Sequence, residues 1–272
     1  MKRSAPNKNR QKDGFASLNP SYFKLWYSVI VPIKGFIENS LIEWEGKIAS
    51  IVFLPTCNFR CPYCHAPHLV QAPNELESIP IDAVVSKLRQ NLGWVDGIVV
   101  TGGEPTSHKR LDVLLKVFKD TGIMVRLDTN GTNPHVIRDL IDRDLVDCVA
   151  MDIKAPLQRE KYEQISGVFC NVEDIKKSIR IIMESGIEYE FRTTVCPTQL
   201  DGDDIEAIAR SIQGAGRYII QSFKPNHCLD TKMLNIEPYP VETLRDFATS
   251  AGKYVDYCCV RGEEGKVLQR NW

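Results

Sequence analysis

Three cysteines lie close together in one stretch of the sequence, TCNFRCPYCHAPH at residues 56–68. Three residues separate Cys57 from Cys61, and two separate Cys61 from Cys64. Structural zinc sites and simple iron–sulfur electron carriers use four protein ligands, because a closed set satisfies the metal. Three thiolates can instead hold a cubane iron–sulfur cluster by three of its irons and leave the fourth open. The spacing therefore predicts an open cluster that takes an exogenous ligand.

Groups that suit an amino-acid ligand follow the strands that the sequence predicts. Gly102 and Gly103 allow the backbone to approach a ligand closely, and Glu104 can accept hydrogen bonds from an ammonium group. Lys154 and Arg192 can pair with a carboxylate. Taken singly, each feature also fits an ordinary turn, a helix cap or a surface position. As a set they predict a site for an amine and a carboxylate at the rim where parallel strands end.

Strand and helix patterns alternate along the chain. Strands are predicted at residues 46–55, 97–103, 123–129, 147–153, 188–195 and 217–223. Helices are predicted between them at residues 81–93, 110–122, 133–145, 172–186 and 203–215, followed by a final helix at 241–252 and an extra edge strand at 254–260. The order predicts an α/β fold with a parallel sheet and outer helices, either a laterally open, incomplete barrel or a doubly wound open sheet.

The composition limits the classes of protein to which this chain can belong. The chain has 272 residues, of which 43% are hydrophobic, and a formal net charge of -1. These values fit one globular domain and argue against nucleic-acid binding, which needs an excess of Lys and Arg. No apolar run suggests membrane insertion or a signal peptide, and nine cysteines without one suggest a reducing, cytoplasmic setting. We expect a basic, disordered tail at residues 1–30, a catalytic domain at 31–262 with a short C-terminal helix and strand, and a tail at 263–272.

The remaining cysteines and the nearby histidines have simpler interpretations. Cys148, Cys170 and Cys196 are expected to be buried thiols. Cys228, Cys258 and Cys259 form the one further group that could hold an auxiliary cluster, although buried thiols are the alternative. His65 and His68 flank the cysteines, where hydrogen-bonding residues are more common than metal ligands.

The motifs resemble a known superfamily. CNFRCPYC matches the CxxxCxφC motif of radical S-adenosylmethionine (SAM) enzymes, with Tyr63 at the aromatic position, and GGEP supports the match. Residues 35–67, the LDTNG and MDIKAP segments and the late VRG are similar to the activating protein of anaerobic ribonucleoside-triphosphate reductase. The similarity extends over roughly residues 35–262.

The resemblance implies a partial (βα)6 TIM-type barrel that binds a [4Fe-4S] cluster on Cys57, Cys61 and Cys64. It implies reductive cleavage of SAM to a 5'-deoxyadenosyl radical, which takes hydrogen from a glycine of a partner such as anaerobic ribonucleotide reductase. A flavodoxin- or ferredoxin-type protein would donate the electron. The implied cofactor contacts are Tyr63 at the adenine, Gly102, Gly103 and Glu104 at the methionyl amine, Lys154 and Arg192 at the carboxylate, and Asp128, Thr129 and Asp152 near a monovalent cation.

One departure leaves the substrate open. Activases of this kind usually read CHNP after the third cysteine, whereas this chain has Ala66 between His65 and Pro67. A radical SAM enzyme that acts on a small molecule, a nucleoside or another peptide is therefore an alternative. A non-catalytic zinc or iron–sulfur protein with His65 or His68 as fourth ligand is a third interpretation, but it leaves GGE, DTNG and MDIK without a role.

Overall fold

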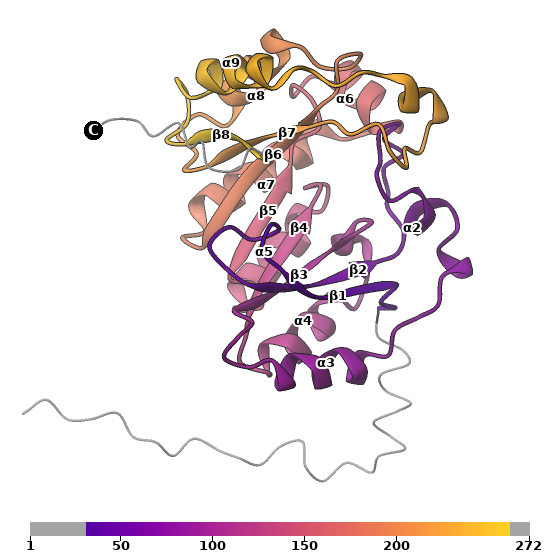
Figure 1. Cartoon of the computed structure of the whole chain (residues 1–272). Helices are drawn as coiled ribbons and strands as arrows, with labels where there is room; N and C mark the ends of the chain where they lie inside the picture. Colours follow the sequence, from indigo (N-terminus) through magenta and orange to yellow (C-terminus); the bar gives the residue numbers. More distant parts are fainter. Residues whose placement is uncertain (1–30, 262–272) are drawn as a thin grey trace, which may run out of the picture.

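The computed structural model describes residues 31–261, in which eight strands form one sheet in chain order. The strands are β1 Gly35–Ser40, β2 Ala49–Leu54, β3 Gly97–Gly102, β4 Met124–Thr129, β5 Cys148–Asp152, β6 Glu188–Val195, β7 Tyr218–Ser222 and β8 Cys258–Arg261. Strand β1 pairs antiparallel with β2, and β2 to β8 run parallel. Within this part of the chain β1 and β8 do not pair, so the curved sheet is a barrel open at one side (Figure 1).

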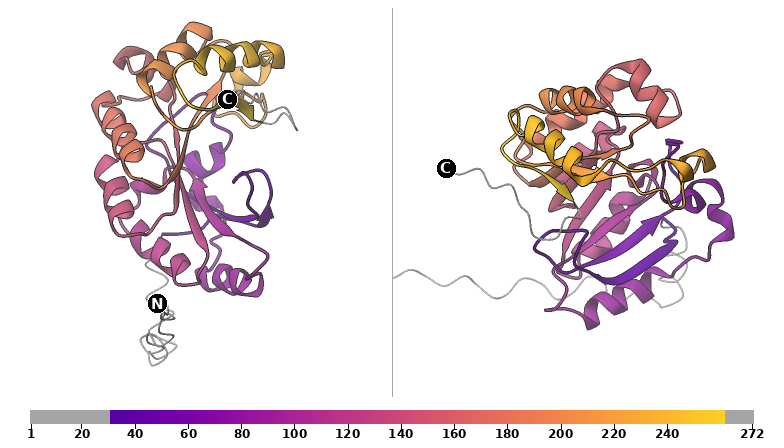
Figure 2. Two further views of the ribbon diagram at one scale, coloured as in Figure 1. Left: turned by 90° about the vertical axis from the view of Figure 1, so that its left-hand side faces the viewer. Right: turned by 45° about the horizontal axis from the view of Figure 1, so that its top comes forward.

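Helices connect the parallel strands and cover the outer face of the sheet (Figure 2). The α-helices are α2 Pro67–Gln71, α3 Ile81–Gln90, α4 Leu111–Lys119, α5 Pro134–Asp142, α6 Arg159–Ser166, α7 Val172–Glu184, α8 Gly202–Ser211 and α9 Val241–Ala251. Short 3-10 helices lie at Pro73–Glu75, Pro105–Ser107 and Thr231–Asn235. Their starts follow local chemistry: α5 begins with a proline, and α8 begins with a capping box between Asp201 and Asp204.

The two faces of the sheet differ in polarity. Side chains that point toward the helices are apolar and fully buried, as Val52, Val100 and Leu127 illustrate. Each such side chain contributes roughly 1.5–3 kcal/mol through removal of its surface from water. The inner face of β4 and β6 instead carries buried charges, which include Arg126 and Glu190. The helices therefore stabilise the barrel from outside, while its interior holds charged groups that need partners.

The N-terminal end of the barrel is closed by the loop between β1 and β2. Trp44 of this loop is 1% exposed and packs with apolar side chains of β2, β3 and β5. Its indole nitrogen donates to Glu188 Oε1 at 2.9 Å, and Lys47 lies 3.6 Å from the same carboxylate. The loop thus crosses beneath the barrel and reaches the start of β6.

The parallel α/β fold and the partial barrel are confirmed. All six predicted strands are present as β2–β7, and the expected extra edge strand is β8. The sequence patterns did not indicate β1, α2 or α6, because β1 is largely exposed and the two helices are short. The proposed tails lie outside the described residues. No helix within residues 31–261 has the length and apolar character that a membrane span requires.

Candidate functional site

The cysteine loop follows the C-terminal end of β2 and leads into α2. Cys57 and Cys64 are partly buried, and Cys61 is buried. Thr56, immediately before the first cysteine, has φ of 61°, which is strained for a β-branched residue. Two hydrogen bonds hold it: its N–H donates to Leu69 O and its carbonyl accepts from Glu104 N, both at 2.8 Å. The loop is therefore fixed between α2 and the end of β3.

The glycine pair after β3 lies directly against the cysteine loop. A Cβ atom on Gly103 would stand 1.7 Å from Thr56 O, and one on Gly102 would stand 2.4 Å from Leu54 O. Gly102 also has φ of 115°, in the region that favours glycine. The absent side chains thus permit close backbone packing that positions Cys57, in addition to any close approach of a ligand.

Glu104 connects the ends of β3 and β4. Its buried carboxylate accepts hydrogen bonds from Thr106, from Thr129 Oγ1 at 2.7 Å and from Asn130 N at 2.7 Å. Burial raises the pKa of this carboxyl, and the Thr106 and Asn130 donors oppose the shift. Oε1 carries three of these bonds and Oε2 one, so Oε2 retains a lone pair for a further donor.

A second set of contacts joins the cysteine loop to the DTNG segment after β4. Asn130 Nδ2 donates to Asn58 Oδ1 at 2.8 Å, and Asn58 Nδ2 donates to Thr132 Oγ1 at 2.8 Å. These amide contacts were not anticipated from the sequence, although their place beside the first cysteine was a usable signal. They make the loops after β2, β3 and β4 one hydrogen-bonded unit.

On its other side the cysteine loop reaches the far wall of the barrel. The N–H of Arg60 donates to Ser166 O at 2.7 Å, and Asp230 N donates to Pro62 O at 2.9 Å. His65 Nε2 lies 2.9 Å from Lys224 O, and its ring stacks on Phe223. His65 thus has a hydrogen-bonding role, as expected. The loop spans the C-terminal mouth of the barrel from β2 to the segment after β7.

Charged side chains line the barrel beneath this loop. Arg192 donates from Nε to Asp152 Oδ1 at 2.7 Å and from Nη1 to Asp128 Oδ2 at 2.9 Å. Arg126 binds Asp128 Oδ1 at 2.9 Å, and Lys154 Nζ binds Asp152 Oδ2 at 3.0 Å. Lys154 and Arg192, expected to meet a ligand carboxylate, are therefore both paired with aspartates of this chain.

The surroundings of the cysteines fit an iron–sulfur cluster and SAM. Burial raises the pKa of Cys57 to about 12 and that of Cys61 to about 11, so these thiols hold their protons until a metal displaces them. Tyr63 is 4% exposed, and its buried hydroxyl has no hydrogen-bond partner among the described residues. Burial raises its pKa, and the charges of Cys61 and Asp152 add to the effect, which places it beside the cysteines. Such an orphaned hydroxyl suits a ligand above the loop.

The other cysteines do not gather into a site. Within residues 31–261 no three His, Cys, Asp or Glu side chains converge on a single metal ion. A cubane does not require such convergence, because each thiolate binds a different iron. Cys258 pairs with Tyr218 at the start of β7, whereas Cys228 follows Ser222 at the other end of that strand, which spans roughly 13 Å at 3.3 Å per residue. An auxiliary cluster on Cys228, Cys258 and Cys259 is therefore not supported.

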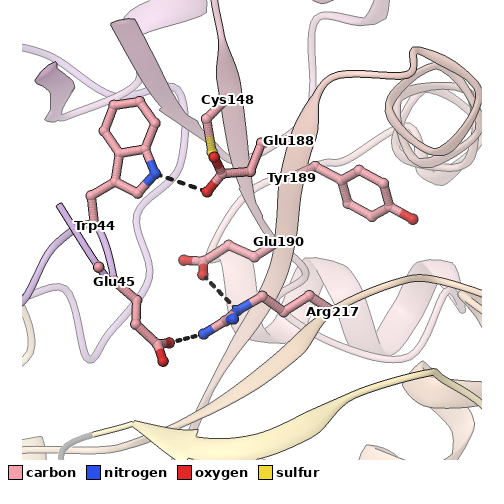
Figure 3. Close-up of a pocket in the computed structure, with 8 residues that line it drawn as sticks. Trp44, Glu45, Cys148, Glu188, Tyr189, Glu190 and Arg217 are labelled. Carbon is pink, nitrogen blue, oxygen red and sulfur yellow. Dashed lines mark hydrogen bonds and ion pairs between the residues drawn. The ribbon is translucent and has the colours of Figure 1, made fainter. Parts of the chain in front are cut away.

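A separate pocket lies at the opposite, N-terminal end of the barrel (Figure 3). It is lined by residues that include Glu45, Glu190 and Arg217, with the Trp44 indole at one side. Arg217 pairs with Glu45 and lies 3.4 Å from Glu190, so the charges of the pocket are largely matched with one another. We assign the site to the cysteine end, where the strand ends and the unsatisfied Tyr63 hydroxyl converge.

An open-sided parallel barrel with three cysteines in the loop after its first parallel strand defines a radical SAM enzyme. The comparisons agree: the Radical SAM superfamily profile matches residues 51–212. The chain belongs to this superfamily and binds a [4Fe-4S] cluster and SAM.

Two curated relatives differ in the function their names state. A protein of Methanocaldococcus jannaschii, named as a glycyl-radical enzyme activating enzyme, is 32% identical over 239 residues, 86% of this chain and 97% of that protein. A 7-carboxy-7-deazaguanine synthase of Thermococcus kodakarensis is 26% identical over 219 residues, 74% of this chain and 83% of that protein. The first match covers nearly the whole relative.

Solved structures support the fold. Streptococcus suis SuiB, bound to its precursor peptide SuiA, superimposes with a TM-score of 0.60 at 15% identity over 95% of this chain. The match spans 58% of that longer protein, and at this identity it concerns the fold alone.

Proposed function

We propose that this protein is a glycyl-radical enzyme activase, which uses SAM to remove hydrogen from a backbone glycine of a partner enzyme. The observation that carries the proposal is the match to the M. jannaschii activating enzyme over 97% of its length. Anaerobic ribonucleotide reductase is the proposed partner, on the sequence resemblance. A flavodoxin- or ferredoxin-type protein is the proposed electron donor, and the cytoplasm the proposed location.

The residues around the site receive the following proposed roles. Cys57, Cys61 and Cys64 hold the cluster, and Tyr63 packs beside the adenine with its hydroxyl toward the ligand. When bound, the cluster and SAM supply the reductive cleavage that yields the 5'-deoxyadenosyl radical.

The methionyl end of SAM would be held from the opposite side. Gly102, Gly103 and the remaining lone pair of Glu104 Oε2 face the amine. Lys154 Nζ has two N–H groups beyond the one given to Asp152, which suit a carboxylate.

Deuterium transfer tests the activase proposal. A peptide that carries α-deuterated glycine in the sequence of the partner's radical loop is incubated anaerobically with SAM and a reductant. Deuterium is expected in 5'-deoxyadenosine with the reconstituted wild type and not with Cys61→Ala. Because the cysteine variant differs from the wild type at one proposed cluster ligand, it controls for chemistry unrelated to the cluster.

The match to a 7-carboxy-7-deazaguanine synthase, together with Ala66, favours a second candidate, a radical SAM enzyme that acts on a small heterocycle or nucleoside. In that case a deuterated small molecule would label 5'-deoxyadenosine, while every glycyl-radical protein tested gave no label. That result would replace the activase proposal.

A further inference from the structure

Asp128 and Asp152 end the neighbouring strands β4 and β5, where related activases are expected to place a monovalent cation. All four of their carboxylate oxygens already face a cationic group of this chain. Asp128 Oδ1 and Oδ2 bind Arg126 and Arg192, both at 2.9 Å. Asp152 Oδ1 binds Arg192 at 2.7 Å and Oδ2 binds Lys154 at 3.0 Å. Potassium or sodium bound between the aspartates would lie beside these cationic groups and be repelled by them.

The third expected ligand of such a cation is also engaged. Thr129 Oγ1 donates to Glu104 Oε1 at 2.7 Å and accepts from Gly131 N at 3.1 Å. These bonds fix the loop after β4 against the end of β3. The hydroxyl proton and one of its two lone pairs are thus used, which leaves a single lone pair for any further contact.

The formal charge of the buried group leads to the same conclusion. Three acids, Asp128, Asp152 and Glu190, face three bases, Arg126, Arg192 and Lys154, and the sum is zero. The side chains of Arg126 and Arg192 are 1% and 6% exposed, and those of Lys154 and Asp152 are 15% and 26% exposed, so solvent screens an added charge only in part. A bound cation would bring uncompensated charge into this partly buried space, which is unfavourable.

The groups that border this set do not create a need for a cation. Arg261 donates to Glu190 at 2.7 and 2.9 Å, and Arg217 lies 3.4 Å from the same carboxylate. Both add positive charge around Glu190, and Arg217 also pairs with Glu45 at the N-terminal pocket. The surroundings of Asp128 and Asp152 are thus rich in built-in cations.

We propose that Arg126, Arg192 and Lys154 replace the monovalent cation in this protein, so that its SAM site is complete without potassium or sodium. Arg192 is the central member, because its guanidinium bridges the two aspartates. Lys154 is the most exposed of the three cationic side chains, at 15%. The inference concerns the cofactor site alone and holds for either candidate substrate, so its outcome is independent of the proposed function.

The wild-type protein provides the deciding measurement. Its thermal unfolding midpoint and SAM affinity are compared in KCl, NaCl and tetramethylammonium chloride at equal ionic strength, with the cluster reconstituted. Both quantities are expected to be the same in the three salts. A specific site filled a hundredfold above its Kd would raise the midpoint by roughly 5–10 °C. A saturable rise of that size with K⁺ or Na⁺, relative to tetramethylammonium, would overturn the inference.

A charge-removing variant tests the replacement directly. Arg126→Gln leaves the buried set one negative charge in excess and opens Asp128 Oδ1. Its unfolding midpoint is expected to rise saturably with K⁺ or Na⁺ but not with tetramethylammonium. Arg143→Gln, which removes an exposed arginine paired with Asp139 and Asp112, is the matched control and should show no cation preference.

One result with Arg126→Gln would contradict the inference. A folded Arg126→Gln protein that shows no difference among the salts would contradict the claim that Arg126 stands where a cation otherwise binds. If the variant does not fold in any salt, the wild-type comparison decides the question by itself.

Discussion

Replacement of Gly103 by alanine should displace the cysteine loop. The added Cβ would lie 1.7 Å from the carbonyl oxygen of Thr56 and 2.4 Å from its carbon, so the two backbones must separate by more than 1 Å. The hydrogen bonds Gly103 N to Leu54 O and Glu104 N to Thr56 O, both 2.8 Å, would then weaken. Two lost bonds at about 1 kcal/mol each, together with about 1–3 kcal/mol of overpacking, give a loss of roughly 3–5 kcal/mol in unfolding free energy.

Gly216→Ala is the matched control, because its Cβ would meet only Tyr189 Oη at 3.8 Å, an ordinary contact. Both variants are measured by urea unfolding and by iron content after anaerobic reconstitution. Gly103→Ala is expected to lose stability and to retain less cluster, since the loop that carries Cys57 moves, whereas Gly216→Ala should keep both. If Gly103→Ala matched wild type in both measurements, the close packing of these two segments would be wrong.

Three further outcomes follow from the same contacts. Cys61→Ala should lose the iron and the brown absorbance after reconstitution, whereas Cys148→Ala, altered at the start of β5, should keep both; the reverse result would refute the ligand assignment. Trp44→Ala should lower the unfolding free energy by about 3–5 kcal/mol, since the ring is buried. Trp94 is 79% exposed, so Trp94→Ala should change the unfolding free energy by about 0.5 kcal/mol or less. Equal effects of the two substitutions would contradict the packing of Trp44 beneath the barrel. Burial opposes ionisation of Asp152, but Arg192 and Lys154 outweigh it and lower the pKa of this carboxyl in the folded protein. The ionised carboxylate therefore stabilises the fold at pH values above its ordinary pKa near 3.9, and this stabilisation is lost as the pH falls below that value. The stability difference between wild type and Asp152→Asn should accordingly shrink from pH 5 to pH 2, and a constant difference would show that the ion pairs contribute nothing.

Sequence patterns were sufficient for the local features of this protein. The spacing of Cys57, Cys61 and Cys64 is a property of one loop, and it predicted an open cluster. The alternation of strand and helix patterns predicted β2–β7 and the longer helices between them, because hydrophobic periodicity reports which face of each segment is buried. Parallel strands bring their C-terminal ends to one rim, so the placement of GGE, DTNG and MDIK beside the cysteines also followed.

A further signal was present in the sequence but was not used. Arg126 and Asp128 alternate along β4, and Glu188, Glu190 and Arg192 alternate along β6. Alternate residues of a strand share one face. Charges at those positions, in strands whose other residues are apolar, could have indicated a charged barrel interior.

Tertiary structure alone decided which groups become partners. Arg192 meets both Asp128 and Asp152 because three strands align in register, and Glu190 meets Arg126 across the curve of the sheet. Gly103 proved to be a close-packing position against Thr56 as well as a proposed ligand contact. These pairings depend on register, curvature and the path of the cysteine loop, which arise from contacts between residues far apart in the chain. Local sequence sets the type and orientation of each side chain, but the low polarity of the barrel interior then forces every buried charge to find a partner that only the folded chain brings within reach.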